Sequence, residues 1–288
     1  MANWLQRLET AWSRRNRRRG GVSAEAEGRE PVCIITGGSE GIGRHLANEF
    51  AGHGHRILLI ARSAENLDRA ASELRRDFGA EAHAAPIDLT LPGYVNAIQD
   101  ALDRHGLYAD ILVNNAGIGL GGPFAGQDPA RVIELCRLNI EALTLLTHSF
   151  LPGMLRRGRG GILNIASIGG LFPGPYEAAY YASKAYVMSL TEALAYENAG
   201  LGVRISAAAP GPVATRFHER MQAASAFYLH MQLVMRPETA ARIIHSAFMG
   251  RRTVIVPGLI PSFNAFAVRL IPHVILVPFI GWFLKRRY

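Results

Sequence analysis

The chain has 288 residues, of which 49% are apolar and 19% are charged. This composition supports a large hydrophobic core, so it excludes a disordered chain and suits one large α/β domain. Two cysteines exclude a disulfide framework and favour a reducing, cytoplasmic compartment, and because neither lies in a Cys/His cluster we predict no metal site.

The net charge of +8 is concentrated at the two ends of the chain. Residues 1–30 hold seven Arg against four Glu, and the chain closes with Lys285, Arg286 and Arg287 before a final tyrosine. The body carries no zinc-finger spacing, RNA-binding motif or basic stripe, so we expect no nucleic-acid partner. An anionic membrane surface or an anionic ligand explains two basic ends better.

Residues 1–30 are predicted to form a basic amphipathic arm and a linker. Apolar residues recur at helical spacing at Trp4, Leu5, Leu8 and Trp12, and five Arg follow within 14–19. This pattern predicts a short amphipathic helix, and it lacks the long apolar stretch of a signal peptide. The Gly- and Glu-containing stretch that follows is typical of a flexible linker.

Residues 31–257 alternate between short apolar runs and amphipathic patterns. The predicted strands are 32–35, 56–60, 82–87, 111–113, 161–166, 203–208 and 253–256, and the predicted helices are 42–52, 64–78, 93–105, 129–156 and 177–199. Continuous apolar strands that alternate with helices predict a doubly wound parallel sheet covered on both faces, which is a single-domain Rossmann-type α/β fold.

Residues 258–288 form an apolar tail that prolines interrupt. Its longest uncharged stretches have about 15 residues, whereas a membrane-spanning helix needs about 20. Pro272 and Pro278 break the pattern and Arg269 lies in its middle. We therefore expect an interfacial or oligomer-forming tail rather than a membrane span.

A glycine-rich turn joins the first predicted strand to the first predicted helix. Residues 36–43 read TGGSEGIG. Glycines at such a turn let the backbone approach a pyrophosphate, and the helix N-terminus supplies amide donors. The turn alone is a weak signal, but the strand before it and the helix after it favour a dinucleotide site.

Tyr180 and Lys184 are one turn apart in a predicted helix and therefore share a face. A phenol has a pKa near ~10, and a neighbouring ammonium lowers that pKa by favouring the phenolate. An isolated Tyr-x-x-x-Lys is usually a packed Tyr and a surface Lys. Here Lys184 is one of only two lysines among 31 basic residues, which favours a specific role.

Three further polar or turn motifs end predicted strands. Ser167 follows the strand 161–166, the sequence NNAG at 114–117 follows 111–113, and PGPV at 210–213 follows 203–208. The carboxyl ends of parallel strands meet at one edge of a sheet, where ligands of open α/β sheets bind. These motifs together predict the site at that edge.

In this order, the motifs resemble those of the short-chain dehydrogenase/reductase family, over about residues 31–257. The resemblance implies that Tyr180 is the general acid/base, that Ser167 holds the substrate carbonyl, and that Lys184 binds the nicotinamide ribose and lowers the Tyr180 pKa. Asn139 would hold a water that links Lys184 to solvent. The other matching positions would bind the cofactor: Gly37, Ser39, Gly41, Ile42 and Gly43 at the phosphates and ribose, Asp88 and Leu89 at the adenine, Asn114 on the adenosine side, and Pro210, Gly211, Val213 and Thr215 at the nicotinamide.

The end of the second strand bears on the choice of cofactor. An acid there binds the ribose hydroxyls of NAD, but this chain has Arg62, which could pair with the 2′-phosphate of NADP. Glu40 points the other way, because many NADP-preferring relatives carry a basic residue at that place. NADP is therefore favoured over NAD.

The sequence predicts an oxidoreductase that interconverts a carbonyl and a secondary alcohol, with an apolar substrate such as a 3-oxoacyl chain or a steroid-like ketone. Apolar side chains after the motifs suit a hydrophobic cleft: Leu171, Phe172, Tyr176, Phe217, Met221, Phe227, Tyr228, Leu229, Met231, Leu233 and Met235. An ordinary core or a dimer surface explains them equally well. The alternatives are a reductase of a polar sugar or small metabolite, and a catalytically silent NADP-binding sensor or scaffold.

The two ends of the chain bear on location and partners. An apolar arm and tail beside basic clusters are typical of segments that attach to an anionic membrane. We expect a cytoplasmic protein with peripheral contact to the cytoplasmic face of a membrane, and a homo-oligomer, either a dimer or a tetramer. The competing interpretation is that the tail packs on a partner subunit.

Overall fold

The structure is a computed structural model that describes residues 26, 28–217, 221, 234–258, 261 and 270–285. The predicted amphipathic helix within residues 1–19 lies outside the described residues, as does most of the stretch between 218 and 233.

Seven parallel strands form one sheet in the order β3-β2-β1-β4-β5-β6-β7. Their bounds are β1 Glu30–Thr36, β2 Arg56–Ala61, β3 Ala82–Pro86, β4 Leu107–Asn114, β5 Gly160–Ile165, β6 Val203–Ala208 and β7 Val254–Ile255. The strand order reverses between β1 and β4, which opens a crevice at the carboxyl edge of the sheet. The predicted Rossmann-type doubly wound fold is confirmed.

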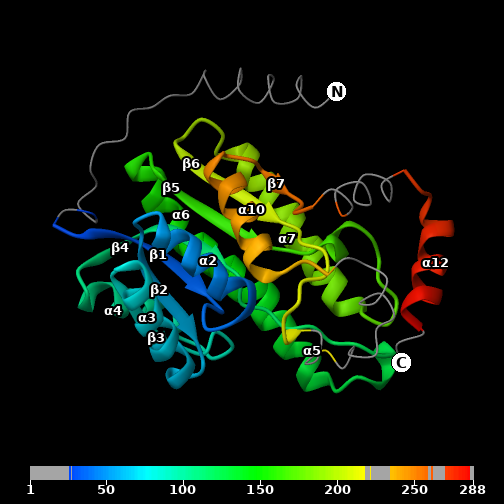
Figure 1. The fold of residues 1–288 in the computed structure, drawn as a ribbon. Helices are drawn as coiled ribbons and strands as arrows, with labels where there is room; N and C mark the ends of the chain where they lie inside the picture. Colours follow the sequence, from blue (N-terminus) through cyan, green and yellow to red (C-terminus); the bar gives the residue numbers. More distant parts are fainter. Residues whose placement is uncertain are drawn as a thin grey trace.

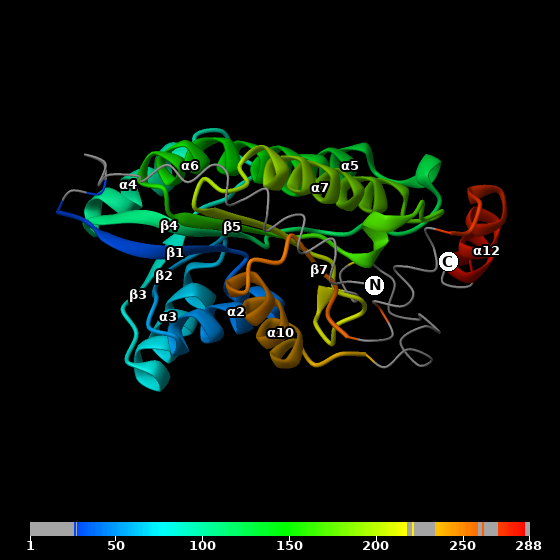
Figure 2. The ribbon, with the colours of Figure 1, turned by 90° about the horizontal axis from the view of Figure 1, so that it is seen from above.

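Helices cover both faces of the sheet (Figure 2). One face carries α4 (Tyr94–Arg104), α5 (Pro129–Cys136), α6 (Leu143–Arg157) and α7 (Ala178–Glu197), and the other carries α2 (Gly41–Gly52), α3 (Ala64–Phe78) and α10 (Pro237–Met249). The strands point fully buried side chains alternately into these two layers: Ile35 and Leu59 pack toward the α2 layer, and Ile34 and Leu58 toward the α4 layer. The central strands are apolar on both faces for this reason.

Local signals explain where the helices start and stop. Ser63 caps α3, because its hydroxyl accepts a hydrogen bond from the Asn66 amide at 3.3 Å. Gly79 ends the same helix at φ 61°, a left-handed conformation that favours glycine. Pro237 occupies the first turn of α10, followed by Glu238, which suits a helix start.

The predicted helix 129–156 is divided in the structure. Between α5 and α6, the six residues of η4 (Arg137–Ala142) form a π-helical turn. Such turns arise where a helix accommodates one extra residue, often at a functional site. Asn139 lies in this turn and hydrogen-bonds the loop after β4, and the apolar periodicity alone gives no sign of the interruption.

Two helices were not predicted from the sequence. One is α10, although Pro237 and the apolar spacing of Ala240, Ile244 and Phe248 carry the signal. The other is α12 (His273–Lys285), which lies beyond the carboxyl edge of the sheet (Figures 1 and 2). Pro272 precedes it and Pro278 lies inside it. Among the described residues, no helix has both the length and the apolar character required to cross a bilayer.

Candidate active site

A cleft with a volume of about 1460 Å³ follows the carboxyl edge of the sheet. It runs from the glycine-rich turn at α2, past the ends of β4, β5 and β6, to α12. A drug-sized ligand fills a pocket of about 300–1,000 Å³, so this cleft has room for a dinucleotide and a substrate together.

The glycine-rich turn forms one end of the cleft. Gly37 and Gly41 have φ of 63° and 58°, and both line the cavity together with Ser39 and Ile42. Gly43 does not line it; a Cβ there would come within 2.3 Å of the Asn115 amide nitrogen, so this glycine permits close packing. The Glu40 side chain does not cap α2, which leaves the first amides of the helix for an anionic group. These residues therefore fit a pyrophosphate.

The two neighbouring asparagines after β4 have different roles. Asn114 is 3% exposed and donates to Thr147 Oγ1 at 3.1 Å and Asn164 Oδ1 at 2.9 Å, so the structure does not bring it to the cavity wall. Asn115 does line the cavity, and its amide donates to the carbonyls of Thr36 (3.0 Å) and Gly37 (3.1 Å). Asn115 thus holds the glycine-rich turn, a role that was not predicted.

Tyr180 and Lys184 both lie on the face of α7 that lines the cleft, and they are 8% and 6% exposed. Lys184 Nζ donates to the Ile165 carbonyl at 2.9 Å and lies 5.8 Å from the centre of the Tyr180 ring. Burial lowers the Lys184 pKa to about 8. The carbonyl of the last residue of β5 therefore holds the Lys184 ammonium beside the Tyr180 ring. The Tyr-x-x-x-Lys spacing predicts this arrangement.

Ser167 lies at the start of η5 (Ile168–Leu171) and lines the same cleft. Its hydroxyl oxygen accepts from the Gly169 amide at 3.1 Å, which orients the side chain and leaves its proton for an acceptor in the cleft. The structure thus brings Ser167, Tyr180 and Lys184 together at one cavity.

Asn139 does not line the cavity. Its side chain accepts from the Ile118 amide and donates to the Ile118 carbonyl, both at 2.9 Å, and it donates to Ser183 at 3.0 Å. A Cβ on Gly117 would lie 3.1 Å from Asn139 Oδ1 and 3.5 Å from Lys184 Nζ. Asn139 therefore joins the loop after β4 to α7 behind Lys184, and its role in holding a water stays a prediction.

The end of β2 forms the opposite flank of the nucleotide half. Arg62 lines the cleft with a side chain that is 64% exposed, and its Nη1 lies 3.5 Å from Glu134 Oε1. Asp88 and Leu89 also line it, and Asp88 Oδ1 accepts from the Thr90 amide at 2.8 Å. Two further arginines that were not predicted, Arg69 and Arg131, line the same region. Arg131 lies on α5, almost 70 residues along the chain from Arg62, so no sequence spacing indicated it.

The loop after β6 closes the middle of the cleft. Pro210, Gly211, Val213 and Thr215 all line it, as predicted for a nicotinamide site. The Ile168 amide donates to the Pro210 carbonyl at 3.1 Å, which ties this loop to the Ser167 turn. The predicted cofactor residues therefore lie along one cavity, apart from Gly43 and Asn114.

The other half of the cleft is mainly apolar. Phe172, Tyr181, Phe217 and Met221 line it, and so do three side chains of α12: Ile280, Phe283 and Leu284. Glu177 is the buried polar exception. Of the apolar residues predicted here, Leu171, Tyr176 and Met235 are not among the lining residues, and Phe227, Tyr228, Leu229, Met231 and Leu233 lie outside the described residues. The contribution of α12 was not predicted, because the tail was assigned to an external interface.

Comparison with known proteins identifies the family. The model of the family "short chain dehydrogenase" matches residues 31–226. The chain belongs to the short-chain dehydrogenase/reductase family. This confirms the family, and with it the oxidoreductase class, that the motifs predicted.

Several relatives with named functions or solved structures resemble this chain. The very-long-chain 3-oxoacyl-CoA reductase of Macaca fascicularis is 35% identical over 64% of this chain, and the match spans 60% of the length of that relative. A putative ketoacyl reductase of granaticin polyketide synthesis from Streptomyces violaceoruber is 36% identical over 77% of this chain and 81% of its own. A short-chain dehydrogenase from Sphingobium yanoikuyae, solved in complex with NADPH, is 30% identical with a TM-score of 0.73, covering 83% of this chain and 93% of its own.

Proposed function

We propose that the protein reduces the ketone of an apolar substrate, such as a 3-oxoacyl chain or a steroid-like ketone, to a secondary alcohol with NADPH. One observation carries the proposal. Ser167, Tyr180 and Lys184 lie where a phosphate-binding half and an apolar half of a single cleft meet. A nicotinamide bound in the first half would supply the hydride, and the protein has to position the ketone and manage the proton.

The side chains assign the steps. The Ser167 hydroxyl donates to the ketone oxygen and holds it beside Tyr180. The Tyr180 phenol gives its proton to that oxygen as negative charge develops, acting as a general acid. The Lys184 ammonium, fixed by the Ile165 carbonyl, stabilises the phenolate that remains.

The apolar half supports a substrate with a hydrocarbon body. Met221 is 4% exposed and packs with Tyr180 in one apolar cluster. Its side chain lies so close to Gly119 that a Cβ there would come within 2.4 Å of it, so Met221 is packed tightly into this wall. Relatives named as 3-oxoacyl and ketoacyl reductases support the same class of substrate.

NADPH oxidation against three substrate classes tests the proposed reaction. The panel contains a 3-oxoacyl thioester, a steroid ketone and a ketose, each with the wild-type protein and NADPH. We expect oxidation with one or both apolar ketones and little with the ketose. Faster oxidation with the ketose would overturn the apolar assignment, and no oxidation with any substrate while NADPH binds would favour a silent sensor.

The preference for NADPH over NADH rests on the basic groups at the adenosine end. Arg62, Arg69 and Arg131 line that end of the cleft, and Glu134 pairs with Arg62 and with Arg131. A 2′-phosphate could replace Glu134 as the partner of Arg62, because charge-assisted guanidinium–phosphate contacts are strong. Relatives solved with NADPH and with NADP support this choice.

We also propose that α12 attaches the protein to an anionic membrane surface. Its inner face holds the buried Leu276 and Leu284, whereas its outer face exposes Val274 (79%), Ile275 (62%), Phe279 (60%) and Trp282 (54%). Lys285 ends the helix, and the sequence continues with two more arginines. Apolar insertion beside basic charge suits an anionic bilayer surface.

Vesicle flotation tests the membrane contact. We expect the full chain to float with phosphatidylserine-containing vesicles at low salt, and the double variant Val274→Asp/Phe279→Asp to float less. Leu91→Asp is the matched control, since Leu91 is 60% exposed but lies far from α12 in the chain. Deletion of residues 1–25 and raised salt should each weaken binding. If the full chain ignores these vesicles and sediments as a dimer or tetramer that the double variant disrupts, the outer face of α12 belongs to an oligomer interface instead.

A further inference from the structure

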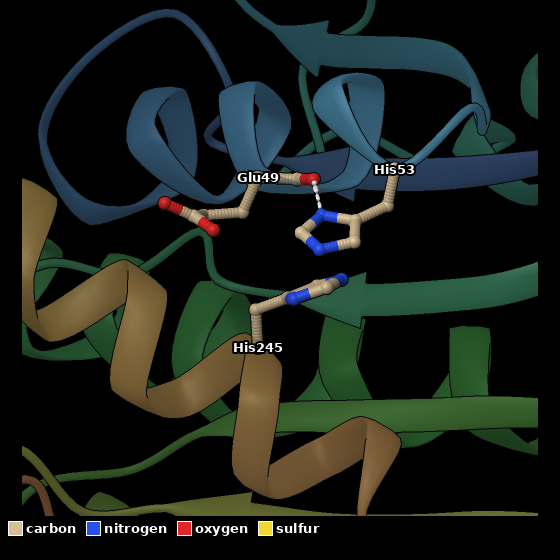
Figure 3. Close-up of side chains that lie close together, drawn as sticks. All are labelled: Glu49, His53 and His245. Atoms are coloured by element: carbon tan, nitrogen blue, oxygen red, sulfur yellow. Dashed lines mark hydrogen bonds between the residues drawn. The ribbon is translucent and has the colours of Figure 1, made fainter.

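A cluster of three potential metal ligands lies between α2 and α10. Glu49 lies in the last turn of α2, His53 directly follows that helix, and His245 faces them from α10 (Figure 3). One ligand atom from each residue lies within 4.8 Å of the other two. None of the three lines the catalytic cleft, so the cluster is separate from the site described above.

His245 is held rigidly in this cluster and has an unused ring nitrogen. Its side chain is 3% exposed, and its Nε2 is buried without a hydrogen-bond partner among the described residues. The rings of Phe50 and His53 flank it, with centroids at 4.7 Å and 4.4 Å. A buried imidazole nitrogen without a partner is costly, and such groups require an explanation.

His53 is oriented as metal-binding histidines usually are. Its Nδ1 donates to the Glu49 main-chain carbonyl at 2.8 Å (Figure 3). This bond fixes the tautomer that leaves the lone pair on Nε2, and a ligating histidine commonly donates its other nitrogen to a carbonyl in this way.

We propose that Glu49, His53 and His245 bind one divalent transition-metal ion, with zinc as the best match. Two imidazoles and one carboxylate suit zinc, whereas calcium and magnesium prefer sets of oxygen ligands. Tetrahedral zinc ligands lie about 3.3 Å apart. Rotation of the half-buried Glu49 side chain, with small shifts of the two rings, would close the remaining gap.

The position of the site indicates what the metal would do. The helix α2 begins at the glycine-rich turn of the cofactor site, and Pro237, the first residue of α10, lines the cleft. A metal that joins Glu49 and His53 to His245 fastens these two helices to each other. Its role would be structural, since none of its three ligands lines the catalytic cleft.

A second histidine pair in the chain offers a matched comparison. His83 and His105 stack with centroids at 3.9 Å, and Glu81 lies beside them. There, His83 Nε2 already bonds Glu81 at 3.0 Å, and Glu81 accepts from Arg56 at 2.7 Å. His83 and Glu81 are therefore engaged with each other, whereas the α2–α10 cluster includes a buried nitrogen without a hydrogen-bond partner among the described residues.

Metal titration of the full, tag-free protein tests the site. After treatment with a chelator and its removal, we expect one zinc per chain to remain bound through gel filtration and the melting temperature to rise by about 5 °C or more at saturating ZnCl₂. Co²⁺ should give the visible absorption of tetrahedral coordination.

His53→Gln and Glu49→Gln are surface changes that should remove the bound zinc and most of the thermal shift, while His105→Gln should leave both unchanged. His245→Gln should also remove the bound zinc and most of the thermal shift. The melting temperature of this variant without zinc shows whether the variant folds. Absence of zinc from the wild type, or zinc binding that persists in His53→Gln and Glu49→Gln, would overturn the assignment.

Discussion

The two halves of the cleft are built in opposite ways. In the nucleotide half, polar groups are fixed by short hydrogen bonds to neighbouring strand ends, as Lys184 is by the Ile165 carbonyl and Asn115 by the glycine-rich turn. In the substrate half, the wall consists mainly of apolar side chains, with Glu177 as a buried polar exception, and three of the apolar side chains come from α12, an element outside the sheet. Under the proposed function, the first half would orient the cofactor through particular polar groups, whereas the second would select the substrate by size and hydrophobicity.

This difference explains why the chemistry could be predicted more fully than the specificity. Positions that serve the cofactor need particular residue types at fixed spacing, so a sequence pattern reveals them. An apolar wall needs only volume and hydrophobicity, and many residues supply these. The largest effects of mutation should therefore come from the polar half.

Among the substitutions in the polar half, Tyr180→Phe should lower the activity most. Loss of the phenol removes the proton donor while the packing of the ring remains, so kcat should fall by about three orders of magnitude with NADPH binding retained. Tyr186→Phe on the same helix is the control, because that hydroxyl bonds Thr144 and lies outside the cleft. Activity of Tyr180→Phe within a few-fold of the wild type would show that the phenol only packs.

Lys184→Met should separate stability from activity. Burial lowers the Lys184 pKa from 10.5 to about 8, so below pH 8 the folded protein holds a charge that the unfolded chain solvates better. Each pKa unit corresponds to about 1.4 kcal/mol, so this charge costs about 3 kcal/mol at pH 7. Between pH 8 and 10.5 the unfolded chain binds more protons at this position, so this contribution makes stability rise with pH.

Urea unfolding of the protein without cofactor measures this effect. Lys184→Met should be inactive, more stable than the wild type at pH 7, and should lack the rise in stability above pH 8 that Lys184 causes. Lys285→Met, which changes the only other lysine, should leave the pH dependence as in the wild type. A variant that is less stable at pH 7 would show that the bond to Ile165 outweighs the cost of burial.

Arg62→Ala tests the proposed preference for NADPH at the cofactor end of the cleft. If Arg62 pairs with the 2′-phosphate, its loss should raise the KM for NADPH by about one to two orders of magnitude and change the KM for NADH little. Arg76→Ala on the outer part of α3 is the control, since Arg76 pairs with Asp77 outside the cleft. Equal use of NADH and NADPH by the wild type would refute the preference and would make Glu40 the deciding residue.

Several features were predictable from the sequence for physical reasons that particular residues show. The strands were predicted because both faces of β1, β2 and β4 are buried. Ser167 was indicated by its place at the end of a strand, Tyr180 and Lys184 by their spacing of one helical turn, and all three by motifs that resemble those of the family. The π turn at Asn139 was not predicted, since a one-residue expansion barely changes apolar periodicity.

Features that depend on packing between distant segments could not be predicted from the sequence. Asn114 and Asn115 are adjacent, and only the direction of the strand end decides which one meets the cleft. Arg131 and Phe283 reach the cleft from distant parts of the chain, so no local pattern could place them there. Prolines 272 and 278 argued against a long helix, but α12 begins directly after the first and continues through the second.

The central claim is that the catalytic groups act beneath an apolar wall to which α12 contributes. The most direct test is to measure how kcat/KM depends on acyl chain length in the wild type and in Phe283→Ala. Each methylene that becomes buried contributes about 0.8 kcal/mol, or roughly a fourfold gain. We predict that kcat/KM of the wild type rises with chain length and that Phe283→Ala flattens this rise for long chains while short substrates react as before. A flat or falling profile in the wild type, or the same profile in both proteins, would contradict a substrate site formed by α12 and the Tyr180 face together.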